Sequence, residues 1–283
     1  MTPPGTAASH LDAPLTASLA AIDPRVPDKA RRYDYWLGGK DNFAADRASG
    51  DAIEEIHPNI KIGVAENRKF LGRVVTCLAT EAGIRQFLDI GTGIPTPDNN
   101  THQIAQTIAP DSRVVYVDND KVVMTHARAL LKGTPQGETA YLEADLRDPD
   151  TILAGLDQAG VLDLSQPVAL LLIAVLHFLT DADHPYAQVA CLLEALPSGS
   201  YLALSHATTD PMPASTAATM RNLGQSDHDR FQLRTRARIE PFLTGLELLD
   251  PGIVSVADWR PDPGTTPPKA ADVCCYGVLA RVP

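Results

Sequence analysis

The sequence predicts an α/β fold with a mostly parallel sheet, because strand-like and helix-like patterns alternate through most of the chain. The predicted strands lie at 85–90, 113–117, 140–143, 168–176 and 201–205. Helical periodicity occupies the intervals, for example at 100–109 and 186–196. Such alternation is typical of parallel strands joined by right-handed helical crossovers. The central run is apolar throughout, as expected for a strand buried on both faces.

The ends of the chain differ from this pattern. Residues 1–24 are rich in Pro, Ala, Thr and Ser without periodicity, which predicts a disordered N-terminal tail. The rest is predicted to form one domain over 25–283, with an N-terminal helical arm over 25–82 and a core over 83–283. Residues 207–230 follow a strand and are long for a simple connection, so we expect a lid-like insertion there. Closing strands are predicted at 247–256 and 273–282, separated by a Pro/Gly-rich stretch that suits an antiparallel hairpin.

Composition narrows the classes of function. The formal net charge of −11 disfavours a nucleic-acid-binding surface, which needs basic residues to neutralise phosphates. The four cysteines form no C-x-x-C pair, and no His or Cys pattern resembles a metal site. The longest apolar run is about half of what a bilayer requires, and the N-terminus does not resemble a signal peptide. We therefore expect a cytoplasmic protein without a metal, a membrane span or a nucleic-acid partner.

Polar and small residues follow three of the predicted parallel strands. Ligands of such folds bind at the carboxyl ends of the strands. After the first strand, Asp89, Gly91, Thr92 and Gly93 make a glycine turn in which the backbone can approach a ligand closely. This turn is the centre of the predicted cofactor site.

The next two strand ends add acids at regular spacing. Asp118, followed by Asn119, can accept hydrogen bonds from both hydroxyls of a ribose. Asp145, between Ala144 and Leu146, can accept from an adenine amino group while the leucine packs against the ring. The order and spacing of these groups predict a site for an adenosine.

The competing interpretation is an NAD-dependent oxidoreductase. Its G-x-G-x-x-G turn seats a pyrophosphate on a helix that begins almost at once. Here Thr96 occupies the third glycine position, and Pro95 and Pro97 delay the helix. Asp98 adds negative charge where a pyrophosphate would lie. S-adenosyl-methionine carries no phosphate, so the loop favours it over NAD.

The chain resembles the S-adenosyl methyltransferases long catalogued as a domain of unknown function, a family of the class I methyltransferases. The resemblance covers about Arg25 to Arg281. It is carried by the segments Ala30–Arg47 (ARRYDYWLGGKDNFAADR), Phe87–Thr96 (FLDIGTGIPT), Arg113–Asp120 (RVVYVDND), Ala144–Pro149 (ADLRDP) and Leu176–Phe178 (LHF). It implies a Rossmann-like, seven-stranded, mostly parallel sheet with an antiparallel last strand and helices on both faces.

The resemblance also assigns roles to matching residues. Gly91 and Gly93 would line the methionine portion of the cofactor, while Asp118 would hold the ribose and Asp145 and Leu146 the adenine. Ile173 and Ala174, at the end of the fourth strand, would lie near the sulfonium. Many class I methyltransferases place a polar Asn or Asp there, so their catalytic apparatus does not carry over to this chain.

Two histidines are candidates for catalytic residues, and three residues of the arm are candidates for binding the substrate or covering the cleft. His177 and His206 follow the fourth and fifth strands, and histidine is a plausible general base at neutral pH. For each, a packed or capping role is the alternative. In the arm, Tyr33, Lys40 and Asn42 belong to a cluster with no helical or strand period, and we expect it to fold over the cleft; a structural cap is the alternative.

These observations predict S-adenosyl-methionine as cofactor, S-adenosyl-homocysteine as product, and a methyltransferase acting on a small-molecule acceptor that the sequence does not identify. A second reading remains open, in which the protein binds the cofactor as a sensor or partner module without transferase activity. An NAD-dependent oxidoreductase is the third.

Overall fold

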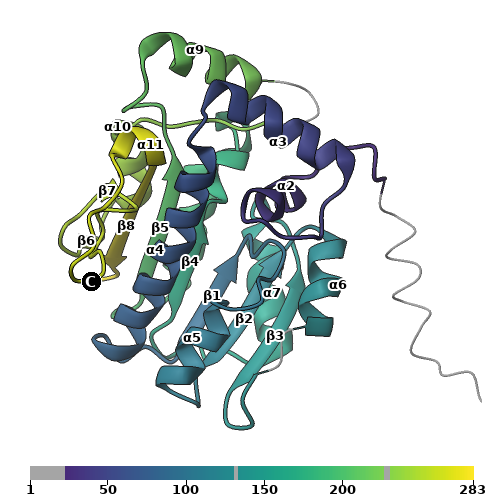
Figure 1. Ribbon diagram of the computed structural model, residues 1–283. Coiled ribbons are helices and arrows are strands. Elements are labelled where there is room, and N and C mark those ends of the chain that lie inside the picture. Colours follow the sequence, from purple (N-terminus) through teal and green to yellow (C-terminus); the bar gives the residue numbers. More distant parts are fainter. Residues whose placement is uncertain (1–22, 131–132, 226–229) are drawn as a thin grey trace, which may run out of the picture.

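A computed structural model describes residues 23–130, 133–225 and 230–283 of the chain, and Figure 1 shows its arrangement. The predicted tail over 1–24 lies outside these ranges except for its last two residues. The described residues form an eight-stranded sheet in the order β3-β2-β1-β4-β5-β8-β6, with β7 also pairing with β8. The strands are β1 (Gln86–Ile90), β2 (Arg113–Asp118), β3 (Glu138–Glu143), β4 (Ala169–Ile173), β5 (Tyr201–Ala207), β6 (Glu247–Leu248), β7 (Val254–Ser255) and β8 (Cys275–Arg281).

The strand directions confirm the predicted fold class. Strands β1 to β5 are parallel to their neighbours, whereas β8 runs antiparallel to β5. Both β6 and β7 pair with β8, so they share the outermost position of the sheet. The prediction of one continuous strand at 247–256 is therefore wrong, because the structure has two short strands, β6 and β7, in this range. Gly252, at φ +79°, lies in the turn that interrupts it.

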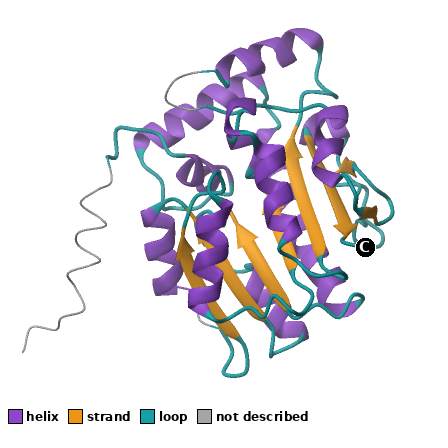
Figure 2. Cartoon of the chain, turned by 180° about the vertical axis from the view of Figure 1, so that it is seen from behind, coloured by secondary structure: helices purple, strands orange, loops and turns teal. Residues whose placement is uncertain are grey.

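Helices cover both faces of the sheet (Figures 1 and 2). The α-helices are α2 (Lys29–Trp36), α3 (Ala44–Ile56), α4 (Ile60–Thr80), α5 (Thr101–Ile108), α6 (Lys121–Leu130), α7 (Pro149–Ala159), α8 (Pro185–Glu194), α9 (Ala214–Leu223), α10 (Arg236–Ile239) and α11 (Ala270–Val273), and the 3₁₀ turns are η1 (Leu176–Phe178), η2 (Asp181–Asp183) and η3 (Glu240–Leu243). Helices α4, α5 and α6 contribute to one apolar cluster, and α7, α8 and η3 to the other. Within the described ranges, no helix is long and apolar enough to cross a membrane.

Successive residues of the central strands enter opposite clusters. Phe87 and Leu171 belong to the cluster under α4, while Leu88 and Leu170 belong to the cluster under α7 and α8. Side chains alternate between the two faces of a strand, so a run that is apolar throughout fills both layers. This explains why 168–176 carries no polar alternation. The strand itself ends earlier than predicted, at Ile173, because the backbone turns at the next residue.

The predicted helical arm contains regular helices also where its sequence shows no helical period. Residues 33–47 were expected to lack periodicity, but they contribute to α2 and α3. Asp28 caps α2 by accepting hydrogen bonds from the backbone of Ala30 and Arg31. The two helices join through Asp46, which is fully buried and accepts from Arg31 Nε at 2.8 Å and from the backbone N–H groups of Asp28 and Phe43, each at 2.7 Å. The arm is therefore an ordered cap.

We expect the substitution Leu171→Ala to lower the free energy of unfolding by about 2–5 kcal/mol, because it leaves a cavity in a fully buried layer. The matched change Leu248→Ala, at a side chain that is 47% exposed on β6, should alter it by less than about 0.5 kcal/mol. Urea unfolding of the two variants measures both values. Similar losses for the two variants would contradict the assignment of the core.

Candidate cofactor and acceptor sites

A cleft lies where β1 to β4 end, and the arm helix α2 contributes to its wall (Figure 1). Every residue predicted to bind the cofactor lines it, and so does Tyr33 from the arm. These residues are Asp89, Gly91, Thr92, Gly93, Asp118, Asn119, Ala144, Asp145, Leu146, Ile173 and Ala174. These residues lie together because the carboxyl ends of parallel strands open at one edge of the sheet; their binding of the cofactor stays a prediction.

The glycine turn after β1 needs glycine for two reasons. Gly91 has φ +77° and Gly93 has φ +66°, in the left-handed region that side chains disfavour. A Cβ atom at Gly91 would also lie 2.4 Å from Val175 Cγ2. The turn is held by the Gly91 N–H, which donates to the Val117 carbonyl at 2.8 Å, and by the Gly93 N–H, which donates to Asp118 Oδ2 at 3.0 Å. The backbone thereby forms a close wall of the cleft.

Asp89 orients the loop that follows this turn. Its buried carboxylate accepts a hydrogen bond from Thr101 Oγ1 at 2.6 Å, and burial raises its pKa. Helix α5 begins only at that threonine, as the prolines predicted. The glycine turn does not lead directly into a helix N-terminus, so the cleft lacks the pyrophosphate seat of the dinucleotide-binding fingerprint.

Asp118 presents a carboxylate whose charge is sensitive to pH. Burial raises its pKa to about 6, although the backbone N–H groups of Gly93 and Asp120 donate to it and oppose this rise. A ligand that donates hydrogen bonds to this carboxylate stabilises the ionised form. Two vicinal hydroxyls of a ribose are donors of the required kind.

Asp145 is held in the ionised form at the third strand end. Burial alone would raise its pKa, but hydrogen bonds from Arg147 and Asn119 outweigh this effect and lower it. The donor Asn119 Nδ2 lies 2.8 Å from Asp145 Oδ2. Ala144 and Leu146 are buried beside it and give this end of the cleft an apolar wall. The combination suits a flat ring with an amino group.

Arg68 of α4 is a cleft residue that the sequence analysis missed. Its Nη2 donates to Thr96 Oγ1 at 2.9 Å and to Asn100 Oδ1 at 3.1 Å. Its Nε is buried and has no hydrogen-bond partner among the described residues. A guanidinium with an unused donor can bind a carboxylate, such as that of a methionine moiety. Helical periodicity places Arg68 on α4 but does not show that this helix borders the cleft.

The end of β4 is shaped by its backbone. Ala174 has φ +56°, and its N–H donates to Ser205 Oγ at 2.9 Å. The serine hydroxyl donates to Asn67 Oδ1 at 2.6 Å, and Asn67 Nδ2 donates to the Tyr33 hydroxyl at 2.9 Å. This chain of hydrogen bonds connects β4, β5, α4 and the arm. Of its members, Asn67 and Ser205 are buried polar residues that no sequence motif marked.

A second cavity adjoins the cleft under the arm. The residues that line both are Lys29, Tyr33, Asn67, Ala174 and Phe178. The rest of its wall is largely apolar and includes Ile53 of α3, Met220 of α9, Met212 and Phe231. Part of the segment 207–230, predicted to be lid-like, therefore encloses this cavity; residues 226–229 lie outside the described ranges.

The two candidate histidines lie in different environments. His206 is fully buried and lines neither the cleft nor the cavity, which corrects the hypothesis that it acts as a general base. Its Nδ1 lies 2.7 Å from the Ala207 carbonyl, and its Nε2 lies 3.1 Å from Arg234 Nη1. Burial and the nearby arginine lower its pKa to about 3, so it is a packed, neutral residue rather than a base.

His177 does line the second cavity, as expected for a candidate catalytic residue. Its Nδ1 is buried without a hydrogen-bond partner among the described residues. Burial, together with the positive charges of Lys29 and Arg234 nearby, holds its pKa well below the ordinary value. The imidazole is therefore neutral at pH 7.

Arg234 positions the loop that carries His177. It is fully buried, donates to the carbonyl oxygens of Leu176 and Leu179 at 3.0 and 2.9 Å, and forms an ion pair with Asp181 at 3.2 Å.

In the part of the chain that is described, no group of three His, Cys, Asp or Glu residues is placed to hold a metal ion.

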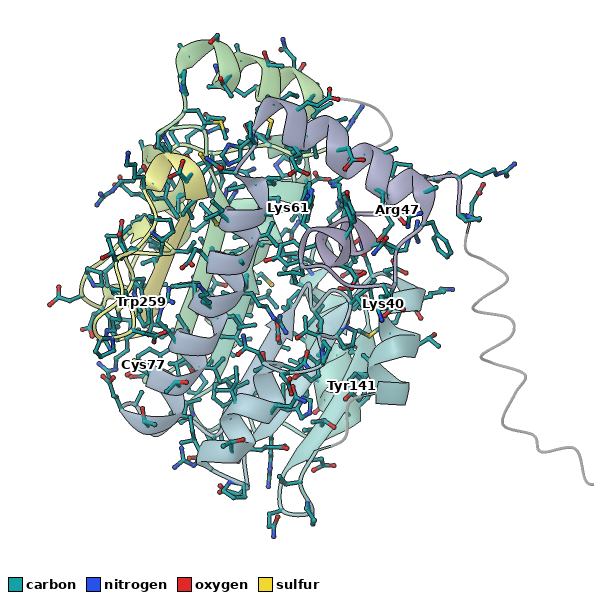
Figure 3. The ribbon with its side chains drawn as sticks, in the orientation of Figure 1. Lys40, Arg47, Lys61, Cys77, Tyr141 and Trp259 are labelled. Atoms are coloured by element: carbon teal, nitrogen blue, oxygen red, sulfur yellow. The ribbon has the colours of Figure 1, made fainter. Side chains whose placement is uncertain are left out.

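Lys40 and Asn42 do not face the cleft, which corrects the hypothesis for the arm. Lys40 is exposed in the loop between α2 and α3 and lines neither cavity (Figure 3). Asn42 Nδ2 donates to Asp34 Oδ2 at 2.9 Å and to the Gly39 carbonyl at 3.1 Å, so its amide holds the loop together. Tyr33 is the predicted arm residue that does reach the cleft.

Comparison with known proteins agrees with this geometry. The family model described as S-adenosyl methyltransferase matches residues 16–283. The chain belongs to the S-adenosyl methyltransferase family. No curated protein matches the chain. Family membership makes it an S-adenosyl-methionine-dependent enzyme and excludes the interpretation as an NAD-dependent oxidoreductase.

Two solved structures are similar over nearly their whole length. One is a DUF574 family protein from Streptomyces avermitilis, with 47% identity, a TM-score of 0.86, and coverage of 92% of this chain and 99% of that one. The other is a candidate methyltransferase from Thermobifida fusca, with 40% identity, a TM-score of 0.84, and coverage of 91% and 96%. Both proteins thus share the fold of this chain.

The residues of the cleft fit the cofactor. Arg68 lines the cleft with a guanidinium whose Nε has no hydrogen-bond partner among the described residues, which suits the methionine carboxylate. No heavy atom lies within 4 Å of the place that a Cβ at Gly93 would take, so the glycine turn leaves room there. The Asp118 carboxylate suits the ribose, and Asp145 with Leu146 suits the adenine.

We expect the affinity for S-adenosyl-methionine to fall about tenfold between pH 7 and pH 5. The pKa of Asp118 is about 6 in the free protein. Because the ribose hydroxyls donate to the ionised carboxylate, binding of the cofactor lowers this pKa. The affinity for S-adenosyl-methionine therefore rises as the pH increases through about 6. Calorimetric titration across this range measures the slope. The variant Asp118→Asn should bind more than about tenfold more weakly and lose most of the slope, whereas Asp98→Asn, exposed outside the cleft, should keep both.

We also expect Tyr33→Phe to lower the free energy of unfolding by about 1–3 kcal/mol, because it removes a buried hydroxyl that accepts from Asn67. The same change at Tyr35, whose hydroxyl makes an exposed hydrogen bond to Asp51, should cost less than about 0.5 kcal/mol. Chemical unfolding of the pair separates the two cases. Equal effects would show that the hydrogen bonds through Asn67 do not stabilise the arm.

Proposed function

We propose that the enzyme transfers the methyl group of S-adenosyl-methionine to a small-molecule acceptor bound in the second cavity. The observation that carries this proposal is the shared wall between the cleft and the cavity. Ala174, at the end of β4, borders both spaces, and so do Tyr33 and Phe178. A methyl group held beside Ala174 would therefore face the second cavity.

The bound cofactor supplies a methyl group already activated by the positive charge on sulfur. The chain must then align the acceptor and exclude water, and such alignment accounts for on the order of 7–11 kcal/mol in intramolecular reactions. The arm covers the cleft through α2, and α9 covers the cavity through Met220. The backbone turn at Ala174, fixed by Ser205, positions the wall between them.

In this proposal each cleft residue binds one part of the cofactor. Asp118 accepts from the ribose, and Asp145 accepts from the adenine amino group. Arg68 donates to the methionine carboxylate, while Asp89 fixes the loop through Thr101. Neither Ile173 nor Ala174 has a polar side chain, so the end of β4 contributes its backbone and shape rather than a proton-transfer group.

Two measurements test the proposal. Calorimetry with S-adenosyl-methionine, S-adenosyl-homocysteine and NAD should give heat with the two sulfur compounds and none with NAD. Incubation with S-adenosyl-methionine and a deproteinised low-mass metabolite extract should form S-adenosyl-homocysteine and a product heavier than its precursor by one methylene. Asp118→Asn should slow this turnover.

The outcomes separate the alternatives. Binding of both sulfur compounds without turnover in any extract would favour the sensor interpretation. Turnover only with a protein fraction would replace the small molecule by a macromolecular acceptor. The absence of heat with either sulfur compound would reject the cofactor site itself.

A further inference from the structure

The second cavity restricts the chemistry of the acceptor. Most of its wall consists of aliphatic, aromatic and sulfur-containing side chains, among them Val64, Met220, Phe231 and Trp36. Apolar walls of this kind bind ligands mainly by burying apolar area, with a few polar groups fixing the orientation. A sugar or another highly hydroxylated acceptor would lose most of its hydrogen bonds with water on entering.

The charged groups of the cavity are all of one sign. Lys29 and Arg32 contribute to its wall, and no Asp or Glu among the described residues does. The Lys29 ammonium lies 4.5 Å from the centre of the Phe178 ring, at the junction with the cleft. An acceptor with an ammonium group would find cations and no carboxylate to pair with, which disfavours it. In a chain with a net charge of −11, this local composition is unexpected.

Three residues of the wall carry buried polar atoms that lack a hydrogen-bond partner among the described residues. These atoms are Trp36 Nε1, His57 Nε2 and His177 Nδ1. A buried polar atom without a partner costs about 1–3 kcal/mol, so such atoms are uncommon unless a water or ligand meets them. An indole N–H can only donate, and a neutral imidazole can donate through one nitrogen. Because these three residues line the cavity, each of the three atoms is a candidate to form a hydrogen bond with an oxygen of a ligand there, the imidazoles in the tautomer that carries a proton on the named nitrogen.

We propose that the acceptor is an apolar, ring-containing compound with an acidic hydroxyl, a phenol or a carboxylic acid, and that it is methylated on that oxygen. This proposal rests on the proposed function and adds the class of substrate. In it, His177 donates a hydrogen bond to the reacting oxygen, and the ring lies between α4 and α9. His177 follows directly on the part of the wall that the cavity shares with the cleft.

The low pKa of His177 agrees with an acceptor that is already acidic, because a poor base cannot remove the proton of an aliphatic alcohol. A carboxylic acid loses its proton to bulk water before binding, whereas a phenol, with a pKa of about 10, loses its proton to water as the positive charges of Lys29 and Arg32 favour the phenolate in the cavity. The oxygen anion then shares a lone pair with the methyl carbon as the carbon–sulfur bond breaks. The bond pair stays on sulfur, which gives the methyl ether or ester and neutral S-adenosyl-homocysteine.

The test uses three probes that share a naphthalene ring and differ in their polar group: 2-naphthol, 2-naphthoic acid and 2-naphthylmethylamine. Calorimetry measures their binding to the full chain saturated with S-adenosyl-homocysteine, and mass spectrometry follows methylation with S-adenosyl-methionine. We expect binding and O-methylation of at least one oxygen compound, and at least tenfold weaker binding of the amine. Preference for the amine, or binding of neither oxygen compound, would overturn the acceptor class.

Variants locate the binding to the cavity. His177→Phe and Trp36→Phe should each weaken binding of the preferred oxygen probe by about threefold to tenfold, while leaving the affinity for S-adenosyl-homocysteine unchanged. The matched control is Trp259→Phe. Its Nε1 is also buried without a partner among the described residues, but Trp259 lies near Cys77 (Figure 3) and lines neither the cleft nor the second cavity. Unaltered probe binding in both cavity variants would overturn the proposal. Failure of S-adenosyl-homocysteine to bind the unmodified chain would instead reject the proposed function.

Discussion

The side-chain amide of Asn67 connects three parts of the molecule that are distant in the sequence. Its oxygen accepts from Ser205 of β5, and its nitrogen donates to Tyr33 of α2. Ser205 in turn holds the N–H of Ala174, where β4 ends. An amide suits this position because it accepts on one side and donates on the other. The arm, the helix α4 and the strand ends are thus held in one fixed relation around the cleft.

This arrangement explains how the site works with an apolar β4 end. A polar side chain at Ala174 would reach toward the reacting atoms directly. Here the backbone N–H of that residue donates to Ser205 Oγ. In the proposed function, the groups that meet the acceptor come from the arm and from the loop around His177, and Tyr33, Asn67 and Phe178, which line both spaces, take the place of a polar side chain at the strand end.

The cofactor cleft could be predicted from the sequence because its determinants are local. A glycine turn and an acid that follow apolar strands line a ligand cleft in many proteins, because the carboxyl ends of parallel strands lie side by side. Gly91, Asp118 and Asp145 therefore line the cleft as the spacing indicated. The same reasoning placed the strands within a few residues, except where Gly252 interrupts the closing strand.

The features that escaped prediction depend on tertiary contacts. Arg234 and Asn67 are buried polar residues, and polar residues in a sequence are ordinarily assigned to the surface. Only the folded chain shows that Arg234 satisfies three oxygen atoms in the loop after β4. The arm was difficult for the same reason. Its helices are short and are fixed by Asp46, whose partners come from both of them.

The two histidines show how burial decides the role of a titratable group. Both follow parallel strands and both are neutral at pH 7, yet both nitrogens of His206 have protein partners, whereas Nδ1 of His177 has none in the described chain. A satisfied, buried imidazole contributes only packing and hydrogen bonds. A buried imidazole that has a nitrogen without a hydrogen-bond partner lowers the stability of the protein, and a ligand that binds this nitrogen restores it. The same reasoning extends to Trp36 and His57, and it is the basis for the proposal that a molecule with an oxygen atom binds in the second cavity.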